Sequence, residues 1–397
     1  MRRLIALVPV AILLASAACG GSSDSNLSTT TPTPTQPIAG AGSNVATLTV
    51  DAGPSQNSVN TPYVSITVCT PGSTSNCQVI DHIEVDTASY GLRILSSVLN
   101  SSLALTQEMD PSGADIVECA VFGDGISWGP VMMADMQISG ETASDIPVQV
   151  IGDPAFSGIP AECTSHGNPE DTVADFGANG IIGVGPFIQD DGDYYTCTGG
   201  VCTQSTTVAV AQEVSNPVAY FAADNNGVIV ELPSVPAGGA TALSGSLVFG
   251  IGTETNNGLG SATIYGLDPN FGTLAVNYKG TSYTNSVIDT GSNALYLVDS
   301  TIPACSDGFF CPASTLENLT AINTGTNNAT GTITFSVANA DSLFSSNADG
   351  IAFVNLAAPN PDNTAFDWGL PFFFNRTVYT AIADQSTPGG TGPYVAY

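Results

Sequence analysis

The sequence is very poor in positive charge. Of its 397 residues, 5 are lysine or arginine and 35 are aspartate or glutamate. Two basic residues, Arg2 and Arg3, fall in an N-terminal segment with the features of an export signal, which leaves Arg93, Lys279 and Arg376 for the rest of the chain. A chain this acidic is repelled by phosphate backbones and by anionic lipid surfaces. We therefore exclude nucleic acid as a partner.

The shortage of lysine and arginine also limits the number of carboxylate ion pairs. Such a protein loses few salt bridges when the pH falls, and protonation of its carboxylates relieves their mutual repulsion. The composition therefore favours an acidic working environment. The alternative is that the acidic residues serve solely to keep the surface soluble.

The sequence has no recognisable motif for a metal or a cofactor. The two histidines, His82 and His166, stand outside any ligand cluster, and no two cysteines have the CxxC spacing. The acidic run at residues 190–193 looks like a calcium loop but lacks a glutamate at the spacing that such loops require. We expect no metal and no cofactor.

The N-terminus is typical of an exported bacterial protein. Residues 1–18 have a basic start, an apolar run and then small residues before Cys19, which predicts a signal peptide. The residues before Cys19 resemble a lipobox, so we expect lipidation of Cys19 and a lipid anchor in the bacterial cell envelope, at the outer membrane or the cell surface. The alternative is a soluble secreted protein that is cut nearby. Residues 19–44, rich in Ser, Thr, Pro and Gly, are expected to form a disordered tether.

Eight of the 9 cysteines remain when Cys19 is set aside. An even number of cysteines in an exported chain predicts disulfides, here four of them. Short sequence separations favour three pairs, and the fourth follows by elimination. The expected pairs are Cys69–Cys77, Cys197–Cys202, Cys305–Cys311 and Cys119–Cys163.

Long helical periodicity is nearly absent from the chain. From residue 45 onward, short runs rich in β-branched residues alternate with clusters of Gly, Asn, Asp and Pro, which is typical of a mostly β protein. Proline and glycine gather between residues 215 and 244, which indicates a boundary between two lobes. We expect an N-terminal lobe at 45–230, a C-terminal lobe at 231–387, a tail at 388–397, and a monomer.

Two segments of the chain nearly repeat each other. Residues 85–92 and 288–295 each place an apolar residue before Asp-Thr-small-Ser, with a leucine six residues after the aspartate. Two such matches indicate a duplicated half, and a duplicated half predicts that Asp86 faces Asp289. The alternative is two unrelated aspartates, each at a strand-to-turn transition.

The repeated motif and the segments around it resemble those of pepsin-like aspartic proteases. The resemblance covers residues 62–382, and its pieces occur in the family's order. They are an opening strand pair before Asp86, a flap-like hairpin at 122–138, a hydrophobic-hydrophobic-Gly element at 180–186, the opening strand of the second lobe at 245–250, and a final element at 368–380. As a whole, the chain resembles an uncharacterised bacterial lipoprotein family related to that fold. The resemblance implies a bilobal, pepsin-like double-ψ β-barrel architecture with a central cleft.

The resemblance also implies roles for individual residues. Asp86 and Asp289 would form a catalytic pair that shares one proton, because two carboxylates a hydrogen bond apart cannot both ionise cheaply. One would act as base on a water while the other donates a proton to the peptide carbonyl oxygen. The residues implied to support this pair follow each aspartate. Thr87 and Thr290 would hydrogen-bond across to the opposite loop, and Ser89 and Ser292 would hydrogen-bond the outer carboxylate oxygens. Gly291 is the small residue implied beside the pair in the second loop. The implied flap tip is Phe122, Gly123, Asp124 and Gly125.

Three residues depart from the family pattern. Ala88 stands where the family has glycine, so its methyl group is expected to crowd the pair. Phe122 stands where the flap usually carries tyrosine, and Arg93 stands where a tryptophan commonly partners that tyrosine. We expect the guanidinium of Arg93 to lie against the Phe122 ring.

The sequence therefore supports an exported aspartic endopeptidase, active at acid pH, with a peptide or protein substrate in the cleft between the lobes. The alternative is a catalytically inactive surface lipoprotein that has the same fold and a binding or structural role. A third hypothesis is a protein that cuts its own tether. The retained Asp, Thr and Ser residues favour the enzyme, whereas Ala88, Phe122 and Arg93 favour the binding protein.

Overall fold

The computed structural model describes residues 38–190 and 192–397. The predicted signal peptide, Cys19 and the predicted tether as far as residue 37 lie outside the described residues. The last part of the predicted tether is held against the folded body: the Ala39 amide donates to Glu231 at 2.6 Å, and the Ser246 hydroxyl donates to the Ala39 carbonyl at 2.9 Å. Among the described residues, no helix is long and apolar enough to span a membrane.

The fold is mostly β, which confirms that prediction. The strands before residue 240 are β1 (Val45–Val50), β2 (Pro62–Cys69), β3 (Cys77–Asp86), β4 (Tyr90–Leu95), β5 (Thr106–Gln107), β6 (Asp115–Val121), β7 (Ile126–Ile138), β8 (Glu141–Ile151), β9 (Gly180–Val184), β10 (Asp193–Thr198), β11 (Val201–Gln204) and β12 (Gly227–Leu232). The later strands are β13 (Leu243–Phe249), β14 (Ile264–Gly266), β15 (Leu274–Tyr278), β16 (Thr281–Ile288), β17 (Leu295–Leu297), β18 (Leu316–Thr324), β19 (Thr330–Val337), β20 (Ala357–Pro359), β21 (Asp367–Trp368), β22 (Arg376–Ala381), β23 (Ser386–Thr387), β24 (Gly390–Thr391) and β25 (Tyr394–Ala396). The described α-helices are short: α1 (Ala161–Thr164), α2 (Val173–Phe176) and α3 (Ala340–Ser346).

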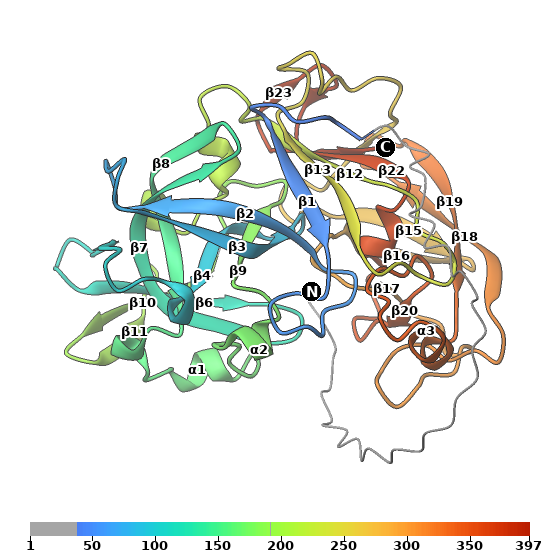
Figure 1. The fold of residues 1–397 in the computed structure, drawn as a ribbon, viewed down its shortest axis with the longest axis horizontal. Coiled ribbons are helices and arrows are strands. Elements are labelled where there is room, and N and C mark those ends of the chain that lie inside the picture. Colours follow the sequence, from blue (N-terminus) through green and yellow to red (C-terminus); the bar gives the residue numbers. More distant parts are fainter. Residues whose placement is uncertain (1–37, 191) are drawn as a thin grey trace, which may run out of the picture.

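Six strands of the first half form a closed ring. The order is β7-β8-β4-β9-β3-β2, and β2 pairs back onto β7. The side chains of β2 show why these segments are strands, because Val64, Ile66 and Val68 are buried while Ser65 between them is exposed. In Figure 1 this half is blue to green, and the orange and red second half lies on the other side of β1 and β13.

A continuous sheet joins the two halves. From the ring it runs through β2-β1-β13-β12-β22-β25-β14, and β1 pairs with β13 along its whole length. The predicted tail at 388–397 is not a loose extension: it contributes β24 and β25, and β25 pairs with both β22 and β14. The C-terminal residues are therefore part of the joining sheet.

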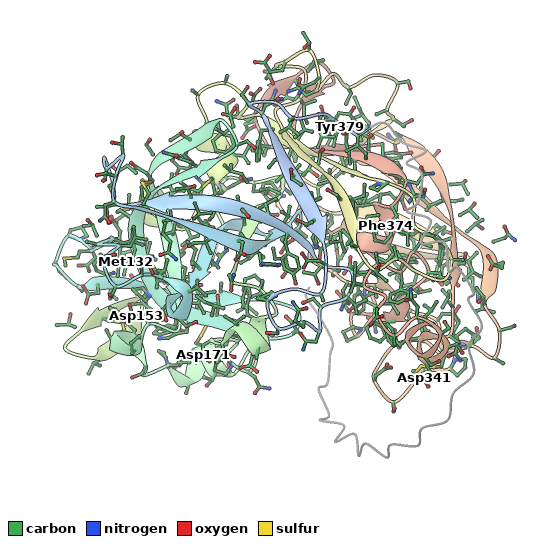
Figure 2. All side chains as sticks on the ribbon, viewed as in Figure 1. Met132, Asp153, Asp171, Asp341, Phe374 and Tyr379 are labelled. Carbon is green, nitrogen blue, oxygen red and sulfur yellow. A yellow bond between two sulfur atoms is a disulfide. The ribbon has the colours of Figure 1, made fainter. Side chains whose placement is uncertain are left out.

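The second half contains a sheet of seven strands in the order β19-β18-β15-β16-β21-β17-β20. Its core is aromatic: the Trp368 ring lies 4.4 Å from Phe366 and 5.5 Å from Phe335, measured between ring centroids. Phe374, labelled in Figure 2, is 3% exposed and belongs to the same buried cluster. Burial of these rings supplies much of the hydrophobic stabilisation of this half.

The described residues contain four disulfides, and they join the pairs that we expected. Three close short loops: Cys69–Cys77, Cys197–Cys202 and Cys305–Cys311. The fourth, Cys119–Cys163, spans 44 residues and ties β6 to α1.

Candidate active site

The same three-strand arrangement holds Asp86 and Asp289. Strand β3 ends at Asp86, and β9 lies between β3 and β4, parallel to the first and antiparallel to the second. Asp289 directly follows β16. Strand β21 lies between β16 and β17, parallel to β16 and antiparallel to β17. Each aspartate therefore begins a loop whose entering and leaving strands are both bonded to one crossing strand.

The two aspartate loops are bound to each other through their threonines. The Thr87 amide donates to the Thr290 hydroxyl at 3.1 Å, and the Thr290 amide donates to the Thr87 hydroxyl at 3.1 Å. Each hydroxyl then donates across the interface, Thr87 to the Ile288 carbonyl at 3.0 Å and Thr290 to the Val85 carbonyl at 2.7 Å. All four bonds are buried, so they fix the two loops relative to each other.

Both aspartates are almost fully buried, at 2% exposed for Asp86 and 1% for Asp289. In each loop, the backbone amide two residues after the aspartate donates a hydrogen bond to its carboxylate. Ala88 donates to Asp86 Oδ1 and Gly291 donates to Asp289 Oδ1, both at 2.7 Å. Burial raises the pKa of Asp289 well above its ordinary value, and the charges of Asp86 and Asp367 and a hydrogen bond with Asp86 raise it further. The Asp86 and Asp289 carboxyls therefore compete for protons as one cluster.

The small residues of the two loops differ in how much space they have. A Cβ atom at Gly291 would lie 2.7 Å from Cγ of Asp86, so a side chain there would collide with the carboxyl group. Ala88, at the matching position of the first loop, is partly exposed and lines the cavity beside Asp86. The extra methyl group that we expected to crowd the pair is thus accommodated at a cavity wall.

The two serines are also unequal. Ser292 donates toward Asp289 Oδ2 at 3.0 Å, in the position that the resemblance implied. Ser89 does not make the corresponding bond with Asp86, and its buried Oγ has no hydrogen-bond partner within the described part of the chain. Ser292 has a second contact that Ser89 lacks, 2.6 Å to Oδ2 of Asp367.

Asp367 is a site residue that the sequence patterns did not reveal. It belongs to β21, the strand that crosses behind the Asp289 loop, and it is 1% exposed. The available signal was weak: a single charge in an otherwise apolar run, where Ile181 occupies the corresponding place in β9. Asp367 lies one residue before the final element of the resemblance, which covers residues 368–380.

A cavity of about 410 Å³ lies beside Asp86. Its walls include Tyr90, Arg93, Phe122 and Asp193. The Arg93 guanidinium lies 5.8 Å from the centroid of the Phe122 ring, the contact that we expected. The cavity therefore presents aromatic and acidic groups beside the buried carboxyl pair.

Arg93 is the positively charged member of a buried ion cluster. Its guanidinium pairs with Glu118 and, at 2.5 Å, with Asp190, and Tyr194 donates to Asp190 at 2.8 Å. Burial raises the pKa of Glu118 well above its ordinary range, with Arg93 acting against that rise and Asp190 adding to it. Arg93 therefore supplies the counter-charge for the Glu118 and Asp190 carboxyl groups.

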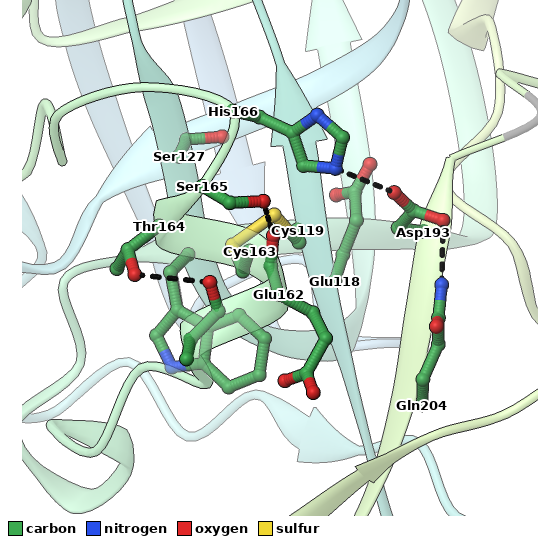
Figure 3. Close-up of a disulfide and its surroundings, with 12 residues drawn as sticks. Glu118, Cys119, Ser127, Glu162, Cys163, Thr164, Ser165, His166, Asp193 and Gln204 are labelled. Carbon is green, nitrogen blue, oxygen red and sulfur yellow. Dashed lines mark hydrogen bonds and ion pairs between the residues drawn. A yellow bond between two sulfur atoms is a disulfide. The ribbon is translucent and has the colours of Figure 1, made fainter.

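The turn at residues 122–125 is held on two sides. The preceding strand β6 pairs with β10 as well as with β7, so it lies inside a sheet. The Cys119–Cys163 disulfide ties β6 to α1, and Ile126 exchanges backbone bonds of 2.9 Å with Asn168 and Glu170. Figure 3 shows the disulfide with the nearby His166–Asp193 pair, 3.9 Å apart. These ties restrict the movement that a free hairpin would have.

Comparisons with known proteins give one family and a distant structural likeness. No curated protein matches the chain. Among solved structures, the chain is similar to the crystal structure of an aspartic proteinase from Irpex lacteus, with 15% sequence identity and a TM-score of 0.47, over 89% of this chain and 96% of that chain. The family model that matches residues 40–397 is DUF3443, described as a protein of unknown function. Because this match covers most of its length, the chain belongs to the DUF3443 family.

Proposed function

We propose that this protein is an exported aspartic endopeptidase whose catalytic groups are Asp86 and Asp289. The observation that carries the proposal is the reciprocal bonding of Thr87 and Thr290, which holds two buried aspartate loops face to face. Two buried carboxyl groups in contact retain a shared proton, and this gives one site both a base and an acid.

The chemistry follows from that shared proton. The ionised carboxylate removes a proton from a water while the water oxygen bonds to the peptide carbonyl carbon, and the other carboxyl group gives its proton to the carbonyl oxygen. One hydroxyl of the tetrahedral diol then gives its proton to the carboxylate that has just become ionised. The carboxyl group that took the proton from water gives it to the amide nitrogen, and the C–N bond breaks. The products are an acid and an amine, and the pair regains its single proton without a covalent intermediate.

The proposal includes an architecture and a location. The paired crossing strands β9 and β21 support a bilobal, pepsin-like double-ψ fold, with the polypeptide substrate in a cleft between the lobes. We place the protein outside the cytoplasm as a monomer, on a lipid anchor at Cys19 in the bacterial envelope. Its strongly acidic composition suits an acidic working pH, at which the self-repulsion of the carboxylates is least.

Cleavage of a denatured protein substrate between about pH 3 and about pH 6 tests the proposal. Wild type is compared with Asp86→Asn and Asp289→Asn, each of which removes one carboxyl group with little change of shape. We expect each substitution to lower the rate by about 10²- to 10⁴-fold. Activity that survives both substitutions would show that these aspartates are not the catalytic pair.

A second function is favoured by the first half of the site. Ser89 lacks the bond that Ser292 makes, and the 122–125 turn is tied on both sides. A surface lipoprotein that binds peptides without cleaving them would retain the fold and the cavity. Peptide binding by wild type that is unaffected by Asp289→Asn, with no cleavage at any pH, would favour this function over the peptidase.

A further inference from the structure

A third carboxyl group lies one hydroxyl away from Asp289. The Ser292 Oγ atom is 3.0 Å from Asp289 Oδ2 and 2.6 Å from Asp367 Oδ2. The other oxygen of Asp367, Oδ1, is buried and has no hydrogen-bond partner within the described residues. Asp367 therefore depends on Ser292 for its polar contact inside the site.

A serine hydroxyl carries one proton, which limits how it can serve two carboxyl groups. If both were ionised, Ser292 could donate to one of them, and the other would be a buried charge facing an oxygen lone pair. If Asp367 keeps its proton, it donates to Ser292, and Ser292 donates to Asp289. The second arrangement satisfies both short contacts and leaves no unpaired charge at Asp367.

The first half of the site provides an internal comparison. Two residues before each catalytic aspartate, Glu84 pairs with Ile181 and Val287 pairs with Asp367. The crossing strand thus carries an isoleucine in the first half and an acid in the second. Where the acid is absent, the hydroxyl of the nearby Ser89 has no hydrogen-bond partner within the described residues. Of the two serines, the one whose hydroxyl is hydrogen-bonded is therefore the one beside an acid on the crossing strand.

The charges around Asp367 favour the protonated form. Among the described residues, Asp86 at the end of β3 raises the pKa of Asp367, and Asp367 in turn raises the pKa of Asp289, which directly follows β16. The basic side chains of the described residues lie against other partners: Arg93 against Glu118, Lys279 against Asp299, Arg376 over the Phe372 ring, and His82 and His166 beside surface aspartates. Burial raises the pKa of Asp367 to about 7, with the Ser292 bond lowering it and the charge of Asp86 raising it.

We propose that Asp367 is a positioning residue that holds a proton inside the site and, through Ser292, couples its own titration to that of the Asp86–Asp289 pair. Protonated Asp367 orients Ser292 as the donor to Asp289. When Asp367 ionises, its negative charge makes the last proton of the pair harder to remove. The pair therefore retains its proton to a higher pH than two carboxyl groups alone would.

The benefit of this coupling to catalysis rests on the proposed function. The protonation of Asp367 itself can be measured without any enzymatic activity. Infrared spectra of the carboxylic-acid carbonyl band, recorded from about pH 5 to about pH 9, report which carboxyl groups carry protons. Wild type is compared with Asp367→Asn and with Asp349→Asn, which removes an exposed carboxyl group from the same half. If the asparagine variant does not fold, Asp367→Ile copies the residue at the matching place in β9.

We expect a wild-type band that titrates with a pKa of about 7 and is missing from Asp367→Asn but present in Asp349→Asn. Bands that remain in Asp367→Asn come from the Asp86–Asp289 pair and from other buried acids such as Glu118, and the band of the pair is expected to titrate about one unit lower than in wild type. If the protein cleaves polypeptides, the alkaline limb of its rate profile shifts by the same amount. Identical bands in wild type and Asp367→Asn would overturn the inference, whereas an inactive wild type with the expected bands would refute the peptidase alone.

Discussion

Thr87 and Thr290 bind each other symmetrically across the two halves of the molecule, each as donor through its amide and as acceptor through its hydroxyl, at 3.1 Å in both directions. This relationship converts a repeated sequence motif into a pair of facing loops. Because both threonines are buried, at 3% and 0% exposed, water cannot replace the bonds when one partner is removed.

We predict that Thr87→Val and Thr290→Val each destabilise the protein. Valine keeps the shape of threonine but leaves a buried amide of the opposite loop without an acceptor, which costs about 1–3 kcal/mol. Chemical unfolding measures this loss, and the double variant is expected to lose less than the sum because both bonds hold the same two loops. Thr290→Ser, which keeps the hydroxyl, is the control. Valine variants as stable as wild type would show that the bonds do not hold the loops together.

The two serines should respond differently to loss of the hydroxyl. Ser292→Ala removes the group that contacts both Asp289 and Asp367, so we expect a cost of about 1–3 kcal/mol in stability and a lower cleavage rate. Ser89→Ala removes a buried hydroxyl that has no partner in the described structure, and should be neutral or slightly stabilising. Unfolding curves of the two variants side by side test this, and equal effects would mean that the halves are functionally equivalent.

Gly291 should not tolerate a side chain. The Cβ of Gly291→Ala would lie 2.7 Å from Cγ of Asp86, so we expect the carboxyl group to be displaced and cleavage to be lost. The matched substitution in the other loop, Ala88→Gly, removes a methyl group at a cavity wall and should cost at most about 1 kcal/mol in stability. Measuring activity and unfolding for both separates collision from general loop damage. An active Gly291→Ala enzyme would argue against close contact between Gly291 and Asp86.

The disulfide beside the cavity should restrict the 122–125 turn. Replacing Cys119 and Cys163 together by serine opens a link across 44 residues, for which we expect a loss of about 2–4 kcal/mol. Amide hydrogen exchange of residues 122–125 should become faster, because β6 loses its tie to α1. The control is the Cys197→Ser, Cys202→Ser pair, which opens a link across 5 residues in the adjoining hairpin. Unchanged exchange in the first variant would show that strand pairing alone holds the turn.

Stability should fall as the pH rises from about 4 to about 7. The pKa of Asp367 in the folded protein is raised from the ordinary value of 3.8 to about 7, so the folded state holds this proton more tightly than the unfolded chain. The resulting stabilisation is fully present below about pH 4 and is lost as the pH approaches about 7. Unfolding free energies across this range should therefore decline by a few kcal/mol, and less steeply in Asp367→Asn. The same slope in both proteins would assign the decline to other groups.

Local patterns in the sequence were enough to predict the class of fold and to point to the two loops of the candidate site. Alternating β-branched runs predicted a mostly β protein, as in β2, and the repeated Asp-Thr-small-Ser motif pointed to Asp86 and Asp289. The eight remaining cysteines predicted the pairs that the structure joins. These inferences depend on residues that are close in sequence or repeated, except that the Cys119–Cys163 pair followed by elimination.

The features that were missed depend on contacts between distant residues. Ser89 and Ser292 look alike in sequence, and they differ because Asp367, 75 residues beyond Ser292, reaches the second serine alone. The pairing of β10 with β6, which places the 122–125 turn inside a sheet, joins strands separated by three others in the chain. Residues 388–397 read as a tail because β25 is a strand of three residues, and its position is set by pairing with β22 and β14.

The dependence of kcat/KM on pH tests the central claim most directly, because a pair that shares one proton is active between the loss of its first and second protons. With a denatured protein as substrate, the account predicts a bell-shaped profile for wild type, with cleavage reduced by about 10²- to 10⁴-fold in Asp86→Asn and in Asp289→Asn at the optimum. A profile without an acid limb and an alkaline limb, or cleavage that persists when either aspartate is replaced, would contradict it.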